Sequence, residues 1–297
     1  MTAHDPLADS LPIGVNTFVW HSPLTQDRAA TTLDTIAVWG YEGVELALEQ
    51  VGDWDVDAIS EQLERLRLRS VVGGVFGPGR ELVAVDTETI ERTQEYVRAA
   101  IAIAARQGSA LVIGPLYTSV GRTWRLVPDE RRHVLKDLRE ALAPLVDAAA
   151  TAGVPLALEP LNRYETSLFN TTEQLLELID PFPAEGVGLN LDTYHMNIEE
   201  KSLDAAFRSA GDRLLHLQVC GNDRGAPGED HLDWAAIRDS LVAIDYRGML
   251  GFESFTSDNE TIATAASIWR PFARTQDELA QRALSQLRSW RSGWPRA

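Results

Sequence analysis

The sequence predicts a single-domain (β/α)8 barrel, the TIM-barrel architecture of the α/β class. Short apolar runs alternate with longer amphipathic runs eight times, a pattern typical of parallel strands joined by right-handed helical crossovers. The chain has 297 residues, of which 44% are hydrophobic, enough for the single core of such a barrel. The first apolar run is not followed by Gly-x-Gly-x-x-Gly, which argues against the alternative of a doubly wound dinucleotide fold.

Each predicted strand is a short, mostly apolar run that ends at polar or turn-forming residues. In chain order the predicted strands are 13–18, 43–48, 70–76, 110–113, 154–158, 187–191, 214–219 and 249–252. The third run ends in the breaker sequence Gly77-Pro78-Gly79, which marks the start of a loop. Eight runs of this kind match the strand number of a closed barrel.

The predicted helices lie between and after these strands and show helical spacing of their apolar residues. They are residues 28–39, 57–68, 87–107, 128–152, 172–179, 203–209, 234–244 and 262–290. Gly108 and Gly153 directly follow the two long helices, where glycine commonly ends a helix. Residues 1–12 are expected to form a flexible N-terminal tail, so that residues 13–297 form the barrel.

Charge and cysteine content narrow the range of partners. The 44 acidic and 27 basic side chains give a net charge of −17. A surface this acidic repels phosphate backbones and anionic lipids, so neither nucleic acid nor membrane is an expected partner. Cys220 is the single cysteine, and we find no signal-like or transmembrane stretch. These features predict a cytoplasmic protein.

Oxygen-bearing side chains stand at the ends of four consecutive predicted strands: Glu159, Asp192, Gln218 and Glu253. The active site of a TIM barrel lies at the C-terminal ends of its strands, so we expect these side chains to gather at one rim. Three crowded carboxylates resist ionising together, and a divalent cation removes that cost. Oxygen-rich ligation favours Mn, Mg or Co over a thiolate-type zinc site. The pattern predicts one metal ion held by all four residues.

Three further polar residues lie in the loops that follow these strands. Glu165, His195 and Arg224 each come within a few residues of a predicted metal ligand. Together they would supply donors and an acceptor for a polyhydroxy substrate.

At this point the sequence resembles a known family. Segments 158–165 (LEPLNRYE) and 192–200 (DTYHMNIEE) are similar to the ketose 3-epimerases, which act on tagatose, psicose and ribulose. These enzymes belong to the xylose-isomerase-like superfamily of sugar isomerases and epimerases. Segments 14–20 (GVNTFVW), 253–255 (ESF) and 267–270 (SIWR) show the same resemblance, which covers essentially the whole chain beyond residue 12.

The resemblance implies a role for each candidate residue. Glu159 and Glu253 would be both metal ligands and the acid/base pair, with Asp192 as a further ligand. The remaining residues would contact the substrate: Glu165, His195 and Arg224 at the O1/O2 end of the sugar, and Trp20 and Phe255 along an apolar wall. The expected metal is Mn, with Co or Mg as alternatives, and the expected partner is a small sugar. A homo-oligomer is left open.

The chemistry expected of such a site is proton transfer next to a carbonyl. The metal would hold the substrate carbonyl and the adjacent hydroxyl and polarise the carbonyl. One glutamate would remove the C3 proton to give a metal-bound enediolate, and the other would return a proton from the opposite face. Bases on opposite faces favour epimerisation over aldose-ketose isomerisation.

One departure from the family keeps alternatives open. Gln218 and Gly221 stand where those epimerases usually have His and often have Glu, respectively. Gln keeps the site charge unchanged, and hydroxypyruvate-isomerase-like relatives use Gln at this metal position, so an aldose-ketose isomerase is one alternative. Another is a 3-oxo-glycoside lyase resembling the C-glycoside deglycosylases, which work with a small second subunit. An endonuclease IV type of site needs many His, whereas this chain has six.

Overall fold

The computed structural model describes residues 11–294, and it confirms the predicted barrel. Eight parallel strands pair in chain order, and β1 pairs with β8 to close the sheet. The strands are β1 (Ile13–Asn16), β2 (Gly43–Leu48), β3 (Arg69–Gly74), β4 (Val112–Gly114), β5 (Leu156–Leu158), β6 (Val187–Asp192), β7 (Leu214–Val219) and β8 (Leu250–Phe252). Residues 1–10 of the predicted tail 1–12 lie outside the described residues, whereas Leu11 and Pro12 are buried and the Pro12 carbonyl accepts a hydrogen bond from the Leu250 N–H.

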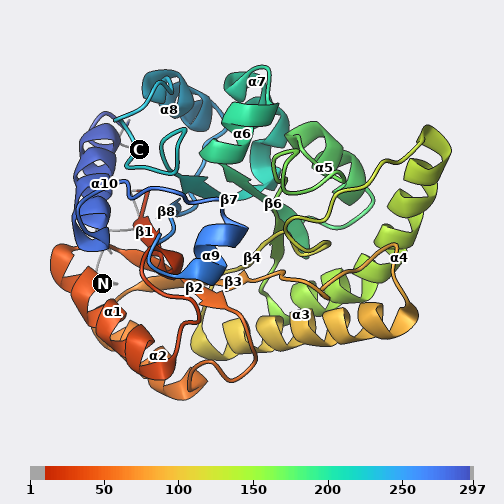
Figure 1. The fold of residues 1–297 in the computed structure, drawn as a ribbon, viewed down its shortest axis with the longest axis horizontal. Helices are drawn as coiled ribbons and strands as arrows, with labels where there is room; N and C mark the ends of the chain where they lie inside the picture. The colour runs from red at the N-terminus through yellow and green to blue at the C-terminus, as the bar shows by residue number, and fades with distance from the viewer. Residues whose placement is uncertain (1–10, 295–297) are drawn as a thin grey trace, which may run out of the picture.

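Helices surround the barrel on its outer face (Figure 1). The helices of the described residues are α1 (Gln26–Trp39), α2 (Val56–Leu66), α3 (Thr87–Gln107), α4 (Pro128–Ala152), α5 (Thr172–Ile179), α6 (Thr193–Glu199), α7 (Leu203–Ala210), α8 (Trp234–Ala243), α9 (Glu260–Ala265), which lies over the barrel mouth instead, and α10 (Gln276–Arg291), with 3-10 turns at Thr17–Val19 and Gly211–Arg213. Because helices cover the outside and side chains fill the inside, most strand residues are buried,.

Local sequence signals explain where most helices begin and end. The side chains of Asp55, Asp86 and Asp233 accept hydrogen bonds from backbone N–H groups in the first turns of α2, α3 and α8, which satisfies donors that have no partner inside the helix. Gly108 and Gly153 follow α3 and α4 in the left-handed conformation, with φ of 73° and 67°. Their predicted role as C-terminal caps is confirmed.

The C-terminal helix prediction was wrong in one respect. Instead of one helix over 262–290, the chain forms α9 and α10 with an irregular segment between them. Ser267 takes a φ of 57°, a left-handed conformation that ends α9, and Pro271 cannot continue a helix. The break lets α9 lie across the barrel mouth (Figure 1), where Ile262 and Ala265 line the pocket.

The barrel interior is closed at one end and hollow at the other. A small apolar cluster of Val71, Leu111, Ile113, Ala157 and Met249 fills the lower part. Glycines in β1 and β2 leave room for the Met249 side chain, whose sulfur would lie within 2.6 Å of a Cβ at either position. The opposite end, where the strands terminate, carries the polar groups described next. Within the described residues, every helix is too short or too polar to cross a membrane.

Candidate active site

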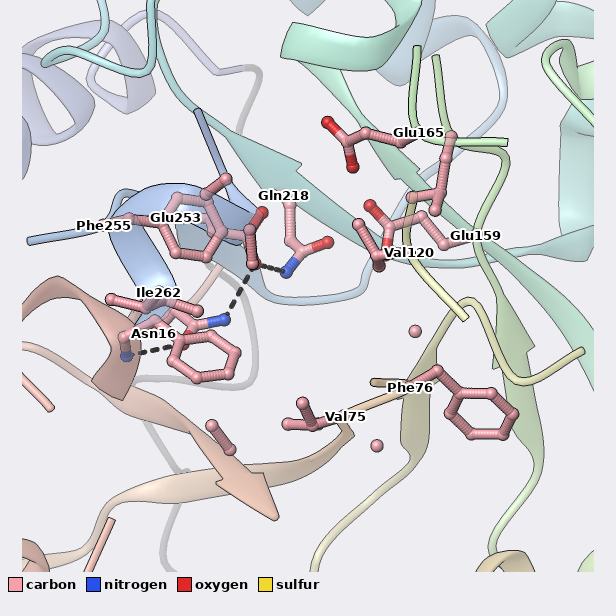
Figure 2. Close-up of a pocket in the computed structure, with 18 of the residues that line it drawn as sticks. Asn16, Val75, Phe76, Val120, Glu159, Glu165, Gln218, Glu253, Phe255 and Ile262 are labelled. Atoms are coloured by element: carbon pink, nitrogen blue, oxygen red, sulfur yellow. Dashed lines mark hydrogen bonds between the residues drawn. The ribbon is translucent and has the colours of Figure 1, made fainter. Parts of the chain in front are cut away.

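A cavity of about 180 Å³ opens at the C-terminal ends of the strands. Eight of the nine sequence-predicted site residues belong to it: six polar residues and Phe255 line the cavity walls, and Asp192 is buried directly behind them. The six lining residues are Glu159, Glu165, His195, Gln218, Arg224 and Glu253, to which Phe255 adds an aromatic wall. Figure 2 shows Glu253 beside Gln218 on one side and Glu159 with Glu165 on the other.

Three buried carboxylates and one guanidinium dominate the electrostatics of the cavity. Burial raises the pKa of the Glu159 carboxyl well above its usual range, and the charges of Glu253 and Asp192 add to this,. Burial also raises the pKa of Glu253, although Arg224 acts against it. For Asp192, burial again acts to raise the pKa, but Arg224, His195 and the hydrogen bond from the Tyr194 N–H together outweigh it, so the pKa is lowered. A single Arg therefore does not balance three carboxylates.

Arg224 reaches the carboxylates from a left-handed backbone position. Its φ is 72°, in a loop rich in glycine and proline, and such conformations of non-glycine residues concentrate at functional sites. The guanidinium donates hydrogen bonds to Asp192 and to Glu253, the latter at 2.9 Å. Its carbon also lies 4.0 Å from the Tyr194 ring centre and 5.1 Å from that of Phe255, so aromatic faces support the charge.

His195 is held as a hydrogen-bond donor toward the cavity. The backbone N–H of Asn162 donates to Nδ1 at 3.0 Å, which favours the neutral tautomer with its proton on Nε2, although a guanidinium nitrogen of Arg224, also a donor, lies 3.1 Å from Nε2,. Burial lowers the pKa of His195, which favours that neutral form,. Nε2 lies 3.5 Å from Glu159 Oε1. The Asn162 side chain also donates to Glu165 Oε1 at 2.8 Å, so one residue orients two predicted substrate contacts.

Gln218 stands at the predicted position, but its amide is turned. Nε2 donates to Glu253 Oε1 at 2.7 Å, while Oε1 accepts from Asn190 at 2.7 Å. The protonated nitrogen, which has no lone pair for a metal, therefore faces the carboxylates. Asn190 Oδ1 is buried without a partner. Turning both amides over would give this oxygen a donor, but it would also direct the Gln218 carbonyl oxygen at the carboxylates of Glu253 and Glu45.

The donor set fits a divalent metal ion. Glu159, Asp192 and His195 present possible ligand atoms within 4.8 Å of one another, and Glu253 reaches the same guanidinium as Asp192. A divalent cation would offset the charge that a single Arg leaves unbalanced, and carboxylate oxygens suit Mn, Mg or Co. In the tautomer described above, His195 serves better as a donor to substrate oxygens than as a ligand.

Comparison with known proteins shows the family to which the chain belongs. Residues 33–288 match the model of the xylose isomerase-like TIM barrel family. The chain belongs to the xylose isomerase-like TIM barrel family. It is 31% identical to the L-ribulose 3-epimerase of Mesorhizobium japonicum over 91% of both chains. Because its relatives include the L-ribulose 3-epimerase of Methylomonas sp. and the D-psicose 3-epimerase of Enterocloster bolteae, the chain is an isomerase/epimerase enzyme.

Two solved structures show the same family barrel. One of an L-ribulose 3-epimerase superposes with a TM-score of 0.88 at 29% identity and covers 95% of each chain. The other, a D-allulose 3-epimerase from Methylomonas sp. in complex with D-allulose, has a TM-score of 0.84 at 28% identity and covers 95% of this chain and 97% of that one.

One residue predicted from the family resemblance lies elsewhere. Trp20 does not line this cavity; its indole N–H donates to Asp277 at 2.9 Å, and its ring packs against Trp39. Phe18, which was not predicted, lines the cavity instead of Trp20, and its ring centre lies 5.6 Å from that of Phe255. The 3-10 turn Thr17–Val19 breaks the alternation of a strand, and this break decides which aromatic ring faces the pocket.

Sequence reasoning missed the polar residues that support the site. Asn16 and Asn162 line or adjoin the cavity, and Glu45 and His216 lie buried beneath it. A signal existed for Glu45, because it interrupts the otherwise apolar strand 43–48 (GVELAL). A charge inside a buried strand needs a specific set of partners.

Proposed function

We propose that this enzyme is a divalent-metal-dependent epimerase that inverts C3 of a free ketose or keto-sugar. The observation that carries the proposal is the placement of two buried glutamates, Glu159 and Glu253, in one cavity with a donor-rich set of neighbours. Support for a sugar substrate comes from the ketose 3-epimerases among the relatives and from the D-allulose complex of one of them.

Glu159, Asp192 and Glu253 would hold the ion. Gln218, the fourth predicted ligand, directs its amide nitrogen and not its carbonyl oxygen at Glu253, so it is left out of the proposed ligand set. When bound, the ion supplies Lewis acidity that draws electron density from the substrate carbonyl. We take Mn as the metal, with Co or Mg as alternatives.

The two glutamates would divide the proton transfers. One carboxylate takes the C3 proton, and the electrons of the broken C3–H bond form the C2–C3 double bond of an enediolate. The other glutamate, protonated beforehand, gives its proton to C3 on the opposite face while the carbonyl re-forms. The first glutamate ends protonated and the second ionised, so solvent must reset the pair. In the metal-free site, burial raises the pKa values of both glutamates.

Polar groups around the cavity would bind and orient the sugar. His195 Nε2–H and the Arg224 guanidinium can donate to the carbonyl and hydroxyl oxygens near C1 and C2, and Glu165 can accept from a hydroxyl. Phe18, Phe255 and Ile262 form an apolar wall on the other side and would contact the far end of the sugar. Polar contacts at one end of the sugar and apolar contacts at the other would fix the orientation of its C3 atom in the cavity.

A second candidate is the 3-oxo-glycoside lyase, which uses the same enolisation and then expels an aglycone. One observation favours it: the cavity continues into an outer groove of about 890 Å³, with Phe18, Val75 and Ile262 in the walls of both. An aglycone would find room there. This candidate also brings the expectation of a small second subunit.

The test is a panel of free ketoses and 3-oxo-glycosides, incubated with Mn in deuterated water and followed by product NMR. We expect C3-epimerised ketose with deuterium at C3. Release of an aglycone, without epimerised ketose, would replace the proposal with the lyase. An aldose product would indicate the hydroxypyruvate-isomerase-like alternative.

The variants Glu159→Gln and Glu253→Gln test the two bases directly. Each should lower turnover by about 10²- to 10⁴-fold, the usual contribution of a general base. From a given epimer, the variant that lacks only the reprotonating glutamate should still exchange the C3 proton with deuterated solvent. Starting from the other epimer should reverse the two variants. If one variant stops exchange from both epimers and the other from neither, the reaction has a single base.

A further inference from the structure

A fourth carboxylate, Glu45 of β2, lies beneath the cavity and has no part in the chemistry above. It is completely buried and does not line the cavity. His216 Nε2 lies 2.8 Å from its Oε1. Its Oε2 accepts hydrogen bonds from the side-chain amides of Asn16 and Gln218, both at 2.9 Å. A buried carboxylate is costly without such donors, so this network is a specific feature of the barrel.

The same two amides connect Glu45 to Glu253. Asn16 Nδ2 donates to Glu253 Oε1 at 3.0 Å and Gln218 Nε2 donates to the same oxygen at 2.7 Å (Figure 2). An amide nitrogen carries two hydrogens, and here each nitrogen divides them between the two carboxylates. Glu253 Oε1 is thereby held from two directions, whereas Oε2 contacts Arg224 and stays outside this network.

Both amides are oriented by their oxygens as well. Asn16 Oδ1 accepts from the backbone N–H of Phe18 at 2.9 Å, and Gln218 Oε1 accepts from Asn190. With the oxygens engaged elsewhere, the nitrogens face the space between Glu45 and Glu253. The Glu45 carboxyl stabilises this orientation, because an amide oxygen turned toward Oε2 would face another acceptor in place of a donor.

The opposite wall of the barrel leaves space for the Glu45 side chain. Gly251 of β8 pairs with Gln218 of β7, and a Cβ at Gly251 would lie 1.4 Å from Glu45 Oε1. Any other residue there would displace the carboxylate. Asn16 and Glu45 are paired neighbours on β1 and β2, so four strands contribute to the network.

We propose that Glu45 is a positioning residue for Glu253: it keeps the amide nitrogens of Asn16 and Gln218 directed at Glu253 Oε1 and so leaves Oε2 as the oxygen that meets the substrate carbon. This inference rests on the proposed function, in which Glu253 is one of two bases. Glu45 itself touches no substrate. Disturbing it should therefore slow proton removal by Glu253 more than proton removal by Glu159.

The test compares Glu45→Gln with a matched control, Glu81→Gln. Glu81 is also a buried glutamate with hydroxyl and Arg donors, from Thr118, Ser119 and Arg122, but it lies outside the cavity. In Glu45→Gln an amide replaces the carboxyl group that accepts from Asn16 and Gln218. An amide offers one acceptor oxygen and one donor nitrogen, so the orientation of Asn16 and Gln218 is no longer enforced.

The measurement is deuterium uptake at C3 from D-allulose and, separately, from its C3 epimer D-fructose, with Mn present. Glu253→Gln identifies the epimer whose exchange depends on Glu253. For that epimer we expect Glu45→Gln to lower exchange by about 10- to 100-fold, the effect of misplacing a catalytic group by a fraction of an ångström to 1 Å. Exchange from the other epimer, and both rates in Glu81→Gln, should stay within about threefold of wild type.

Equal loss from both epimers in Glu45→Gln would show a general structural role and overturn the inference, as would unchanged rates from both. If Glu159→Gln and Glu253→Gln do not each lose C3 exchange from a different epimer, the two-base proposal itself fails, whatever the result for Glu45→Gln. Thermal unfolding of each variant, with and without Mn, checks folding. If Glu45→Gln does not fold, Asn16→Ala removes one of the two connections and should give the same one-sided loss.

Discussion

The two halves of the barrel contribute differently to one cavity. From β1–β4 the cavity wall takes mainly small or apolar residues, such as Ala47, Gly73, Gly74 and Ile113. From β5–β8 and the loops that follow them it takes charged and polar groups, above all Glu159, Gln218, Glu253 and Arg224. The first half supplies space and the second half supplies the chemistry.

This division shows how a symmetrical fold supports an asymmetrical reaction. All eight strands end at the same rim, so every strand offers a position for a catalytic group. Here the glycines of the first half keep side chains out of the cavity, which leaves room for a substrate opposite the carboxylates. Glu45 is the exception, because it brings a charge from the first half to the underside of Glu253. The predictions below test this division, from the largest expected effect to the smallest.

Removal of divalent metal should have the largest effect, because the carboxylates of the second half would lose the ion that offsets their charge. Treatment with a chelator followed by desalting should abolish epimerisation, and Mn or Co should restore it. The measurement is turnover of the best ketose of the panel against added metal. Full activity after exhaustive metal removal would contradict the metal-dependent mechanism.

Loss of Arg224 should destabilise the metal-free protein. Arg224→Met would leave Asp192 and Glu253 buried without their counter-charge, and breaking a buried ion pair from one side costs roughly 3 to 5 kcal/mol of unfolding free energy. The measurement is urea unfolding of the metal-free protein, and added Mn should recover part of the loss.

The matched control for Arg224 is Arg65→Met in the first half. Arg65 pairs with Asp34 on the surface, with both side chains more than half exposed, and exposed ion pairs contribute little to stability. Equal destabilisation by the two variants would show that the buried ion pairs of Arg224 with Asp192 and Glu253 contribute no more to stability than an exposed ion pair.

The smallest expected effect is a difference in kcat/KM between variants of two neighbouring aromatic residues of the first half, Phe18 and Trp20. Phe18→Ala removes part of the cavity wall and should lower kcat/KM by roughly tenfold, mainly through KM, as loss of apolar contact with a substrate does. Trp20→Ala should leave kcat/KM unchanged and lower only the Tm, since Trp20 contacts Asp277 and Trp39 outside the cavity. A lower kcat/KM for Trp20→Ala with no change for Phe18→Ala would support the original prediction that Trp20 contacts the substrate.

Local patterns were enough to predict the barrel and most of the cavity. Each strand and helix forms from a continuous stretch of chain, so its periodicity and capping residues can be read directly. The parallel order of the strands then sends all their C-terminal ends to one rim, which is why Glu159, Asp192 and Glu253 could be grouped without coordinates. The same logic also placed Gln218, although not the direction of its amide.

Only the tertiary structure determined the hydrogen bonds beneath the cavity, because they join residues that are far apart in the chain. Closing the barrel brings β1 beside β8, and only then does Asn16 meet Glu253 while Glu45 occupies the space that Gly251 leaves. The sequence by itself determined which side chains reach the rim, because strand periodicity is a local property. It could not determine which atoms of those side chains face one another, because hydrogen bonds across a closed barrel depend on all eight strands at once.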